Sequence, residues 1–118
     1  MAATLIDGIA IARELYAGFK ERVQALAARG VQPGLAAILV GDNPASEVYV
    51  RTKTRACAEV GVHSVQHRFG RAASADEIIA LIGRLNADPA IHGILVQLPL
   101  PSRLNSERIL QAVAAHKD

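Results

Sequence analysis

Apolar residues recur along the chain with two spacings, which predicts helices alternating with strands. Between residues 9 and 29 they recur at steps of three and four, as on one face of an amphipathic helix, and Gly30 ends this pattern. Short apolar runs at 35–40 and 91–98 predict buried strands. A strand is also predicted at 62–69, but its histidines and glutamine make it more polar than the strand at 35–40.

Capping residues define the helices between these strands. Asn43 is a suitable N-cap and Pro44 a suitable first helical residue, so a helix is expected from Pro44 to Val60. Gly61 then serves as its C-cap. A capping box at 74–77 opens the next helix.

The order of these elements indicates an α/β fold. A last helix is expected from Asn105 through Val113, so each strand is followed by a helix. Strands that alternate with helices favour right-handed βαβ crossovers. We therefore predict one domain over residues 1–118, with three layers: a small, mainly parallel sheet of about three strands, built from βαβ units and flanked by helices. The apolar strand 91–98 should be central, and the polar strand 62–69 should lie near an edge.

Composition excludes several classes of protein. The chain has 118 residues, 51% of them hydrophobic, which is enough for a core and excludes a disordered protein. No apolar run is long enough to span a bilayer, and the N-terminus lacks the pattern of a signal peptide. The single cysteine, Cys57, cannot form an internal disulfide. We therefore expect a cytoplasmic protein without a membrane partner.

The net charge of +2 and the pI near 9.0 do not indicate a nucleic-acid partner. Basic residues are scattered among acidic ones rather than gathered into a stripe. The chain has only two Tyr and two Phe, too few for a surface that stacks bases. A mildly basic surface explains the charge better.

Three polar side chains share one face of the predicted 44–60 helix. Ser46, Tyr49 and Lys53 follow one another at spacings of three and four. This helix begins just after the strand 35–40, so a hydroxyl, an aromatic ring and an amine lie beyond the carboxyl end of a strand. Open α/β sheets usually hold their ligands there.

Gln97 is a single amide in the otherwise apolar segment 93–101. A buried amide without a partner costs roughly 1–3 kcal/mol, so Gln97 needs one. If its strand neighbours the first, Gln97 and Lys53 emerge at the same edge of the sheet. A partly desolvated Lys53 bonded to this amide would have a lowered pKa suited to acid/base chemistry. Each residue also has an ordinary explanation: a solvated Lys53, a Tyr49 at the edge of the core, and a Gln97 that caps a backbone group.

Other catalytic and metal-binding patterns are missing from the sequence. The four histidines have no metal-ligand spacing with Cys57 or a carboxylate, so no metal is expected. There is no G-x-G-x-x-G, P-loop or G-x-S-x-G pattern, and therefore no visible dinucleotide site. Cys57 follows Lys53 by four residues, and we expect it to be a small buried thiol.

Two long segments resemble one enzyme family. They are Leu-Val-Gly-Asp-Asn-Pro-Ala-Ser-Glu-Val-Tyr-Val-Arg-Thr-Lys at 39–53 and Gly-Ile-Leu-Val-Gln-Leu-Pro-Leu-Pro at 93–101. Their order and separation closely resemble bifunctional methylenetetrahydrofolate dehydrogenase/methenyltetrahydrofolate cyclohydrolase. The similarity extends from Ile6 to Asp118, and it covers only the N-terminal, folate-binding catalytic domain of that family.

The resemblance implies a role for each residue singled out above. Tyr49 would stack on the pterin and aminobenzoyl part of the folate, Lys53 would be the acid/base of the cyclohydrolase step, and Gln97 would position Lys53. The implied catalytic residues are thus Lys53, Gln97 and Tyr49. The implied substrate-binding residues are Ser46, Tyr49, Val50, Arg51, Thr52, Lys53, Val96, Gln97 and Leu98.

In the family a hydride passes from 5,10-methylenetetrahydrofolate to NADP, or to NAD in some members. Water then opens the methenyl ring to give 10-formyltetrahydrofolate. The resemblance implies a cytoplasmic enzyme of one-carbon metabolism and purine biosynthesis, with tetrahydrofolate derivatives as partners and a homodimer in the full-length family. A rival interpretation is a non-catalytic folate-binding or interaction domain that keeps the fold without turnover.

The sequence departs from the family pattern at three places. Family members usually continue Lys-Asp-Val-Asp-Gly, and their second Asp binds the pterin, whereas here Asp118 matches the first. Ile9 stands where many relatives have Lys, and Ala115 where they have Pro. We expect the NAD(P)-binding Rossmann domain to be absent from this chain. The chain alone would then not dehydrogenate, because half of the near-attack geometry is missing. Cyclohydrolase needs no nicotinamide, so a trace of that activity could survive, weakened by the loss of the pterin-binding Asp.

Overall fold

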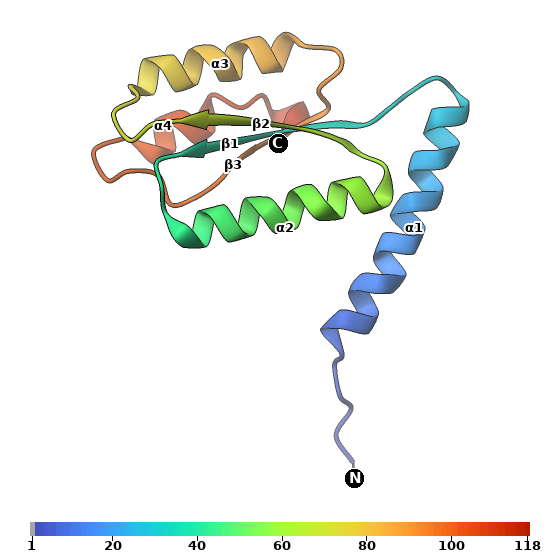
Figure 1. The fold of residues 1–118 in the computed structure, drawn as a ribbon. Helices are drawn as coiled ribbons and strands as arrows, with labels where there is room; N and C mark the ends of the chain where they lie inside the picture. Colours follow the sequence, from blue (N-terminus) through green and yellow to red (C-terminus); the bar gives the residue numbers. More distant parts are fainter. Residues whose placement is uncertain (1) are drawn as a thin grey trace.

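The computed structural model describes residues 2–118. Over this range the backbone forms a sheet between two helical layers, with α2 on one face and α3 and α4 on the other (Figure 1). In chain order the elements are α1 (Gly8–Ala28), β1 (Gly34–Val40), α2 (Pro44–Val60), β2 (His63–Phe69), α3 (Ala75–Ala87), β3 (Gly93–Val96), α4 (Ser106–Gln111) and the 3-10 turn η1 (Ala115–Lys117).

The strands of residues 2–118 form one parallel sheet in the order β2-β1-β3. Ala36 of β1 lies opposite Val65 of β2 and Ile94 of β3. The predicted parallel sheet and the edge position of the polar strand are confirmed. The prediction of a central third strand is wrong, because β1 is central and β3 forms the other edge. The apolar residues of β3 are explained by packing against α3 and the C-terminal segment.

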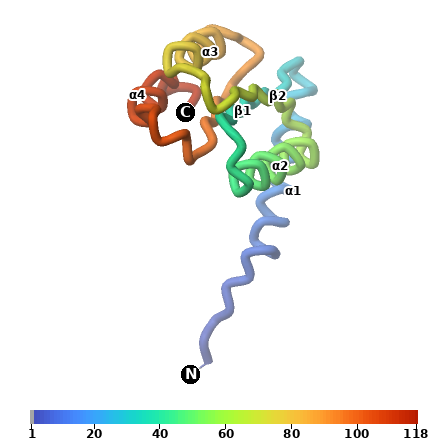
Figure 2. The backbone as a smooth tube through the Cα atoms, turned by 60° about the vertical axis from the view of Figure 1, so that its left-hand side comes forward, coloured from blue at the N-terminus to red at the C-terminus, as the bar shows by residue number. Residues whose placement is uncertain are grey.

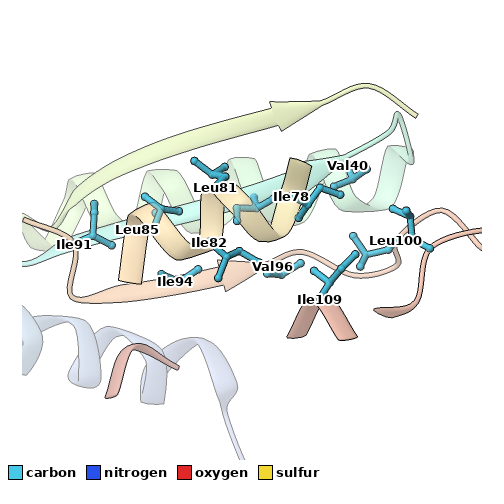
Figure 3. Packing of buried hydrophobic residues seen from close by; sticks show 13 residues of the cluster. Val40, Ile78, Leu81, Ile82, Leu85, Ile91, Ile94, Val96, Leu100 and Ile109 are labelled. Carbon is cyan, nitrogen blue, oxygen red and sulfur yellow. The ribbon is translucent and has the colours of Figure 1, made fainter. Parts of the chain in front are cut away.

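Alternation of side chains along the strands gives the sheet two different faces. From Ala36 onward, the even-numbered residues of β1 and β3 join the apolar face of α3 in one cluster, part of which Figure 3 shows. Its buried members are Ala36, Ile38, Val40, Ile78, Leu81, Ile82, Leu85, Ile91, Ile94, Val96, Leu100, Leu104 and Ile109. The odd-numbered residues of the same strands face α2. The main core therefore lies on the α3 side of the sheet.

Helix α1 stands apart from this sandwich. Figures 1 and 2 show it extending away from the sheet, with only its C-terminal end near α2. No residue of α1 is buried, and Ile11, Leu15 and Phe19 are exposed on its surface. Asp7 caps the helix by accepting hydrogen bonds from backbone amides in its first turn. The predicted helix is confirmed, but the sheet does not cover its apolar residues.

The predicted caps of α2 and α3 are present. The side chain of Asn43 accepts hydrogen bonds from two amides in the first turn of α2. Gly61, with a φ of 90°, ends this helix in the left-handed conformation that glycine adopts without strain. Ser74 and Glu77 form the reciprocal bonds of a capping box at the start of α3.

Helix α4 is shorter than predicted because a side chain from α3 binds the segment after it. The helix ends at Gln111 rather than continuing through Val113. The Asn86 amide donates to the carbonyl oxygen of Ala112 at 2.8 Å, and its oxygen accepts from the amide of Ala114 at 3.0 Å. These two bonds satisfy backbone groups that a further helical turn would have paired.

Lys117 is buried and binds the C-terminal end of α3. Its Nζ atom donates to the carbonyl oxygens of Leu85 and Asp88 at 2.8 and 2.7 Å. Carbonyl groups at a helix C-terminus lack intrahelical partners, and a positive charge is favourable beside them. This contact anchors η1 to α3, and the sequence pattern did not reveal it.

Gly34 marks a close approach between the start of β1 and the segment before β3. A Cβ atom at Gly34 would overlap the carbonyl oxygen of Ala90. The Gly34 amide donates to Nδ1 of His92 at 3.0 Å, and the Gly34 carbonyl accepts from the His92 amide at 2.8 Å. The register of the sheet at this end thus depends on a residue without a side chain.

We expect Gly34→Ala to lower the free energy of unfolding by about 1–3 kcal/mol, the usual cost of overpacking. Urea unfolding followed by circular dichroism measures the loss. Gly83→Ala is a matched control, since a Cβ at Gly83 in α3 meets nothing within 4 Å. Alanine there should raise the free energy of unfolding by about 0.5–1 kcal/mol. Equal urea midpoints for Gly34→Ala and the parent would contradict the close contact.

Candidate active site

Lys53 of α2 and Gln97, directly after β3, meet at the carboxyl edge of the sheet. The Nζ atom of Lys53 donates a hydrogen bond to Oε1 of Gln97 at 2.8 Å. Gln97 extends the pairing of β3, because its amide donates to the carbonyl oxygen of Ile38 at 2.9 Å. Ile94 and Val96 face α3, so strand alternation turns Gln97 toward α2. The hydrogen bond expected between the two side chains is present.

A second contact holds the Gln97 amide in place. Its Nε2 atom donates to the carbonyl oxygen of Leu98 at 3.0 Å, and the hydroxyl of Ser46 donates to the same oxygen at 3.2 Å. Gln97 is 7% exposed and Ser46 is fully buried. Because Nε2 is committed to Leu98, Oε1 is the atom presented to Lys53. From the sequence, Gln97 was expected to bind either Lys53 or a backbone group. In the structure its side chain binds both.

The amine and the aromatic ring of the site remain open to solvent. Lys53 is exposed, and Tyr49, one helical turn earlier, is 53% exposed. The expectation of a partly desolvated Lys53 is therefore wrong for this structure, and Tyr49 does not belong to the core. An exposed ring beside a positioned amine offers one ligand both an apolar surface and a group that can transfer a proton.

Three of the other predicted binding residues differ in exposure. Val50 and Val96 are buried, and Val96 belongs to the core on the α3 side. Their side chains therefore offer no surface to a ligand at this edge. Leu98 is exposed and follows Gln97 directly, so both its side chain and its backbone lie beside the site.

Arg51 and Thr52 are exposed on α2. Arg51 precedes Lys53 by two residues, which places it about 200° away around the helix axis. It lines a cavity beside β2 rather than the face that carries Lys53. Sequence neighbours in this motif therefore serve different surfaces of the molecule.

A cavity of about 790 Å³ lies at the carboxyl ends of all three strands. Its walls come from the loops 41–44, 71–72 and 99–103, together with the end of β1. Neither Lys53 nor Gln97 lines it. The candidate active site is therefore identified by the hydrogen bond between Lys53 and Gln97 and not by this cavity.

A smaller cavity, about 430 Å³, lies between α2 and β2. It is lined by Glu47, Arg51, Thr54, Arg55, Ala58, Gln66 and Arg68. Nη1 of Arg68 lies 2.7 Å from Oε1 of Glu47. The hydrogen bond and positive charge of Arg68 lower the pKa of the Glu47 carboxyl.

Cys57 lies one turn after Lys53 on α2 and is half-buried, so the expected small thiol is only partly enclosed. Burial raises the pKa of the Cys57 thiol, which disfavours a role as a nucleophile. Within residues 2–118, no group of three or more His, Cys, Asp or Glu side chains is arranged to hold a metal ion.

The helix ends at the carboxyl edge do not fit the pyrophosphate of a dinucleotide, which needs free backbone amides. At α2, Pro44 has no amide hydrogen, and Asn43 occupies the amides of the next two residues. At α3, Asp76 and Glu77 place negative charge in the first turn. The helices that follow β1 and β2 thus offer no suitable place for NADP.

Residues 6–118 match the family described as tetrahydrofolate dehydrogenase/cyclohydrolase, catalytic domain. The chain belongs to this family. The bifunctional protein FolD of Burkholderia pseudomallei is 57% identical to it over 118 residues, which are all of this chain and 41% of that protein. The chain therefore spans about two fifths of the length of the curated relatives that it matches.

Solved structures of the family share the whole fold. FolD from Campylobacter jejuni superimposes with a TM-score of 0.97 at 44% identity, covering 99% of this chain and 42% of that one. The enzyme from Trypanosoma brucei, solved with NADP cofactor and inhibitor, gives a TM-score of 0.93 at 33% identity, covering 100% of this chain and 41% of that one. The predicted α/β class is thereby confirmed.

None of the helices in the described part of the chain combines the length and the apolar character that a membrane span requires.

The Glu47–Arg68 pair predicts a pH dependence of stability. The pKa of Glu47 is lowered from 4.5 in the folded chain, so the unfolded chain binds more protons in acid. The pair therefore stabilises the fold above the unfolded pKa, and this contribution is lost as the pH falls through the lower folded value. Glu47→Gln should give a smaller decrease of the urea midpoint on acidification than the parent shows.

Glu59→Gln is a suitable control, because Glu59 is exposed on the same helix and forms no ion pair within residues 2–118. The effect should be small and should weaken with added salt, since both partners reach solvent. Identical pH profiles for Glu47→Gln and the parent would rule out a contribution from the pair.

Proposed function

We propose that this chain is the folate-binding, catalytic part of a bifunctional enzyme. It would bind 5,10-methylenetetrahydrofolate for NADP-dependent oxidation to 5,10-methenyltetrahydrofolate, and hydrolyse that product to 10-formyltetrahydrofolate. Membership of the family supports the substrate class and favours an enzyme over a non-catalytic folate-binding domain. The proposed hydrolytic activity rests on one observation, the hydrogen bond between Lys53 and Gln97 beside an exposed Tyr49.

Hydrolysis of the methenyl group needs a base and then an acid. Water adds to the carbon between N5 and N10 and loses a proton, which the neutral amine of Lys53 accepts. The resulting ammonium donates this proton to N5 as the bond between N5 and the carbon breaks. The remaining hydroxyl proton passes to solvent, and the formyl group stays on N10.

Gln97 serves this step by positioning Lys53. Its Oε1 atom accepts one hydrogen from Nζ, and an amide oxygen cannot donate in return. One hydrogen of the neutral amine is therefore directed at Gln97, and the lone pair remains available to the reacting water. Ser46 supports the same arrangement through the carbonyl oxygen that it shares with Gln97. Tyr49 would bind the flat rings of the folate by stacking.

The oxidation requires a nicotinamide cofactor, which supplies the hydride acceptor when it is bound. Because the helix ends described above do not fit its pyrophosphate, we assign NADP binding to the part of the family's sequence that this chain does not match. The contribution of this chain to oxidation is then to bind and orient the folate.

The same proposal places the enzyme in the cytoplasm, acting on tetrahydrofolate derivatives as a homodimer in its full-length form. The single cysteine, which cannot form an internal disulfide, is consistent with a reducing compartment. The resemblance to the family supports the homodimer.

Hydrolysis of methenyltetrahydrofolate tests the proposal directly. Its absorbance is followed with the parent chain and with Lys53→Ala, and the uncatalysed rate in the same buffer is subtracted. We expect Lys53→Ala to lower the enzymatic rate by about 10²–10⁴-fold, the usual contribution of a general acid/base. Lys20→Ala, at an exposed position of α1, should keep the parent rate.

Gln97→Ala separates positioning from binding. It should lower kcat more than it raises KM, because it leaves Tyr49 and the Lys53 amine in place but removes the acceptor that orients the amine. An unchanged rate in Lys53→Ala would contradict the assigned base. Binding of the folate without any turnover by the parent would reduce the chain to a folate-binding scaffold.

A further inference from the structure

One face of helix α2 carries two arginines that the proposed function does not use. Arg51 and Arg55 lie one turn apart, and Glu47 and Thr54 share their face at helical spacings. This face lines the cavity of about 430 Å³ beside β2. Each arginine is two residues from Lys53, so both lie on nearly the opposite side of the helix from the proposed catalytic amine. The cavity is therefore separate from the folate site.

Polar contacts between α2 and β2 hold the walls of this cavity in place. Gln66 and Arg68 lie on the same face of β2, because side chains alternate along a strand. Nε2 of Gln66 donates to Oγ1 of Thr54 at 2.7 Å, and Nη1 of Arg68 donates to Oε1 of Glu47 at 2.7 Å. The cavity is thus built from a helix and a strand that are bonded to each other, and not from loops.

Arg51 and Arg55 have no counter-ion among residues 2–118. Their guanidiniums together offer ten N–H donors, roughly five each, and none of these donates a hydrogen bond within the described chain. Like charges one turn apart destabilise a helix. Glu47, the one acidic residue in the cavity lining, already binds Arg68. A bound anion would therefore relieve a repulsion that the described chain leaves uncompensated.

The Thr54 hydroxyl and Nε of Arg68 add two more donors at the base of the cavity. Oγ1 of Thr54 accepts from Gln66, so its own hydrogen is free to donate. Arg68 uses Nη1 for Glu47 and Nη2 for Oε1 of Gln66, at 3.4 Å, which leaves Nε. Donors therefore face the cavity from both the helix and the strand.

This arrangement suits phosphoryl groups better than carboxylates. A carboxylate presents two oxygens in one plane, whereas a tetrahedral phosphoryl group presents oxygens to guanidiniums that approach from different directions. Ala58 is the only apolar residue in the lining, so the cavity offers little surface to an apolar ring. Its volume of about 430 Å³ is nevertheless within the range of small-molecule sites, roughly 300–1,000 Å³.

We propose that this cavity is a second ligand site, which binds a small molecule through a diphosphate or two neighbouring phosphoryl groups. Arg51 and Arg55 hold the anion from α2, and Arg68 holds it from β2. The anion then bridges the helix to the edge strand of the sheet. The proposed folate chemistry does not depend on this site, because its residues lie on another face of α2.

Isothermal titration calorimetry of the 118-residue chain with inorganic diphosphate, at low ionic strength and without magnesium, tests the proposal. We expect Arg51→Gln and Arg55→Gln each to weaken binding about three- to tenfold, because each removes charged hydrogen bonds at a partly exposed site. Glu47→Gln should tighten binding, since it removes the negative charge of the lining and releases Arg68. Arg84→Gln, at an exposed position of α3, should leave the affinity unchanged.

Citrate separates recognition of phosphoryl groups from attraction by charge alone, because it carries nearly the same charge as diphosphate at mildly alkaline pH. We expect citrate to bind more weakly than diphosphate. Equal affinities would overturn the phosphoryl assignment. Equal losses in Arg84→Gln and Arg55→Gln would show attraction to any surface arginine and would overturn the site itself.

Amide chemical shifts locate the anion without any substitution. Diphosphate should shift the amides of residues 51–58 and 64–68 and leave those of 97–103 in place. Shifts confined to 41–44 and 99–103 would place the anion in the cavity of about 790 Å³ and would overturn the assignment. The absence of both heat and shifts in the parent chain would refute the second site, while the hydrolysis assay would still decide the proposed function.

Discussion

The pairing of β3 with the buried strand β1 determines where the candidate chemistry lies, because the last bond of that ladder places Gln97. Its amide binds the carbonyl oxygen of Ile38, and strand alternation then turns the side chain toward α2. Lys53 reaches it because α2 begins directly after β1 and runs back beneath the same two strands. A slip of one residue in this register would turn Gln97 into the α3-facing core and leave the lysine without its acceptor.

The two faces of the sheet differ in the residues that they bury. On the α3 side the even-numbered strand residues pack into a continuous apolar cluster, and Lys117 ties the C-terminal turn to that layer. On the α2 side the buried helical residues are few, and Ser46 is one of them. A polar residue in that position supports Gln97 instead of adding to the core. The main apolar core therefore lies on one face, and the polar groups around Gln97 lie on the other.

Local signals in the sequence predicted local structure well. Asn43, Pro44 and Gly61 mark the ends of α2 correctly because caps depend on residues next to one another. The contact between Lys53 and Gln97 was predictable from the βαβ order. The edge position of β3 was not predictable, because an apolar pattern indicates that a strand is buried but not whether a neighbouring strand or a helix covers it. The cavity at the carboxyl ends of the strands also escaped prediction, since its walls come from three loops that share no spacing.

Helix α1 has a consequence for the cooperativity of the molecule. Most helices in proteins gain their stability from an apolar face packed against other elements rather than from their intrinsic helix propensity. In this structure that support is limited to the end nearest α2, where Val23 and Leu26 are half-buried. The first turns of α1 are therefore free to open without disturbing the sheet. Their amide hydrogens belong to the fast-exchanging part of the protein, whereas those of β1 exchange only when the whole sandwich unfolds.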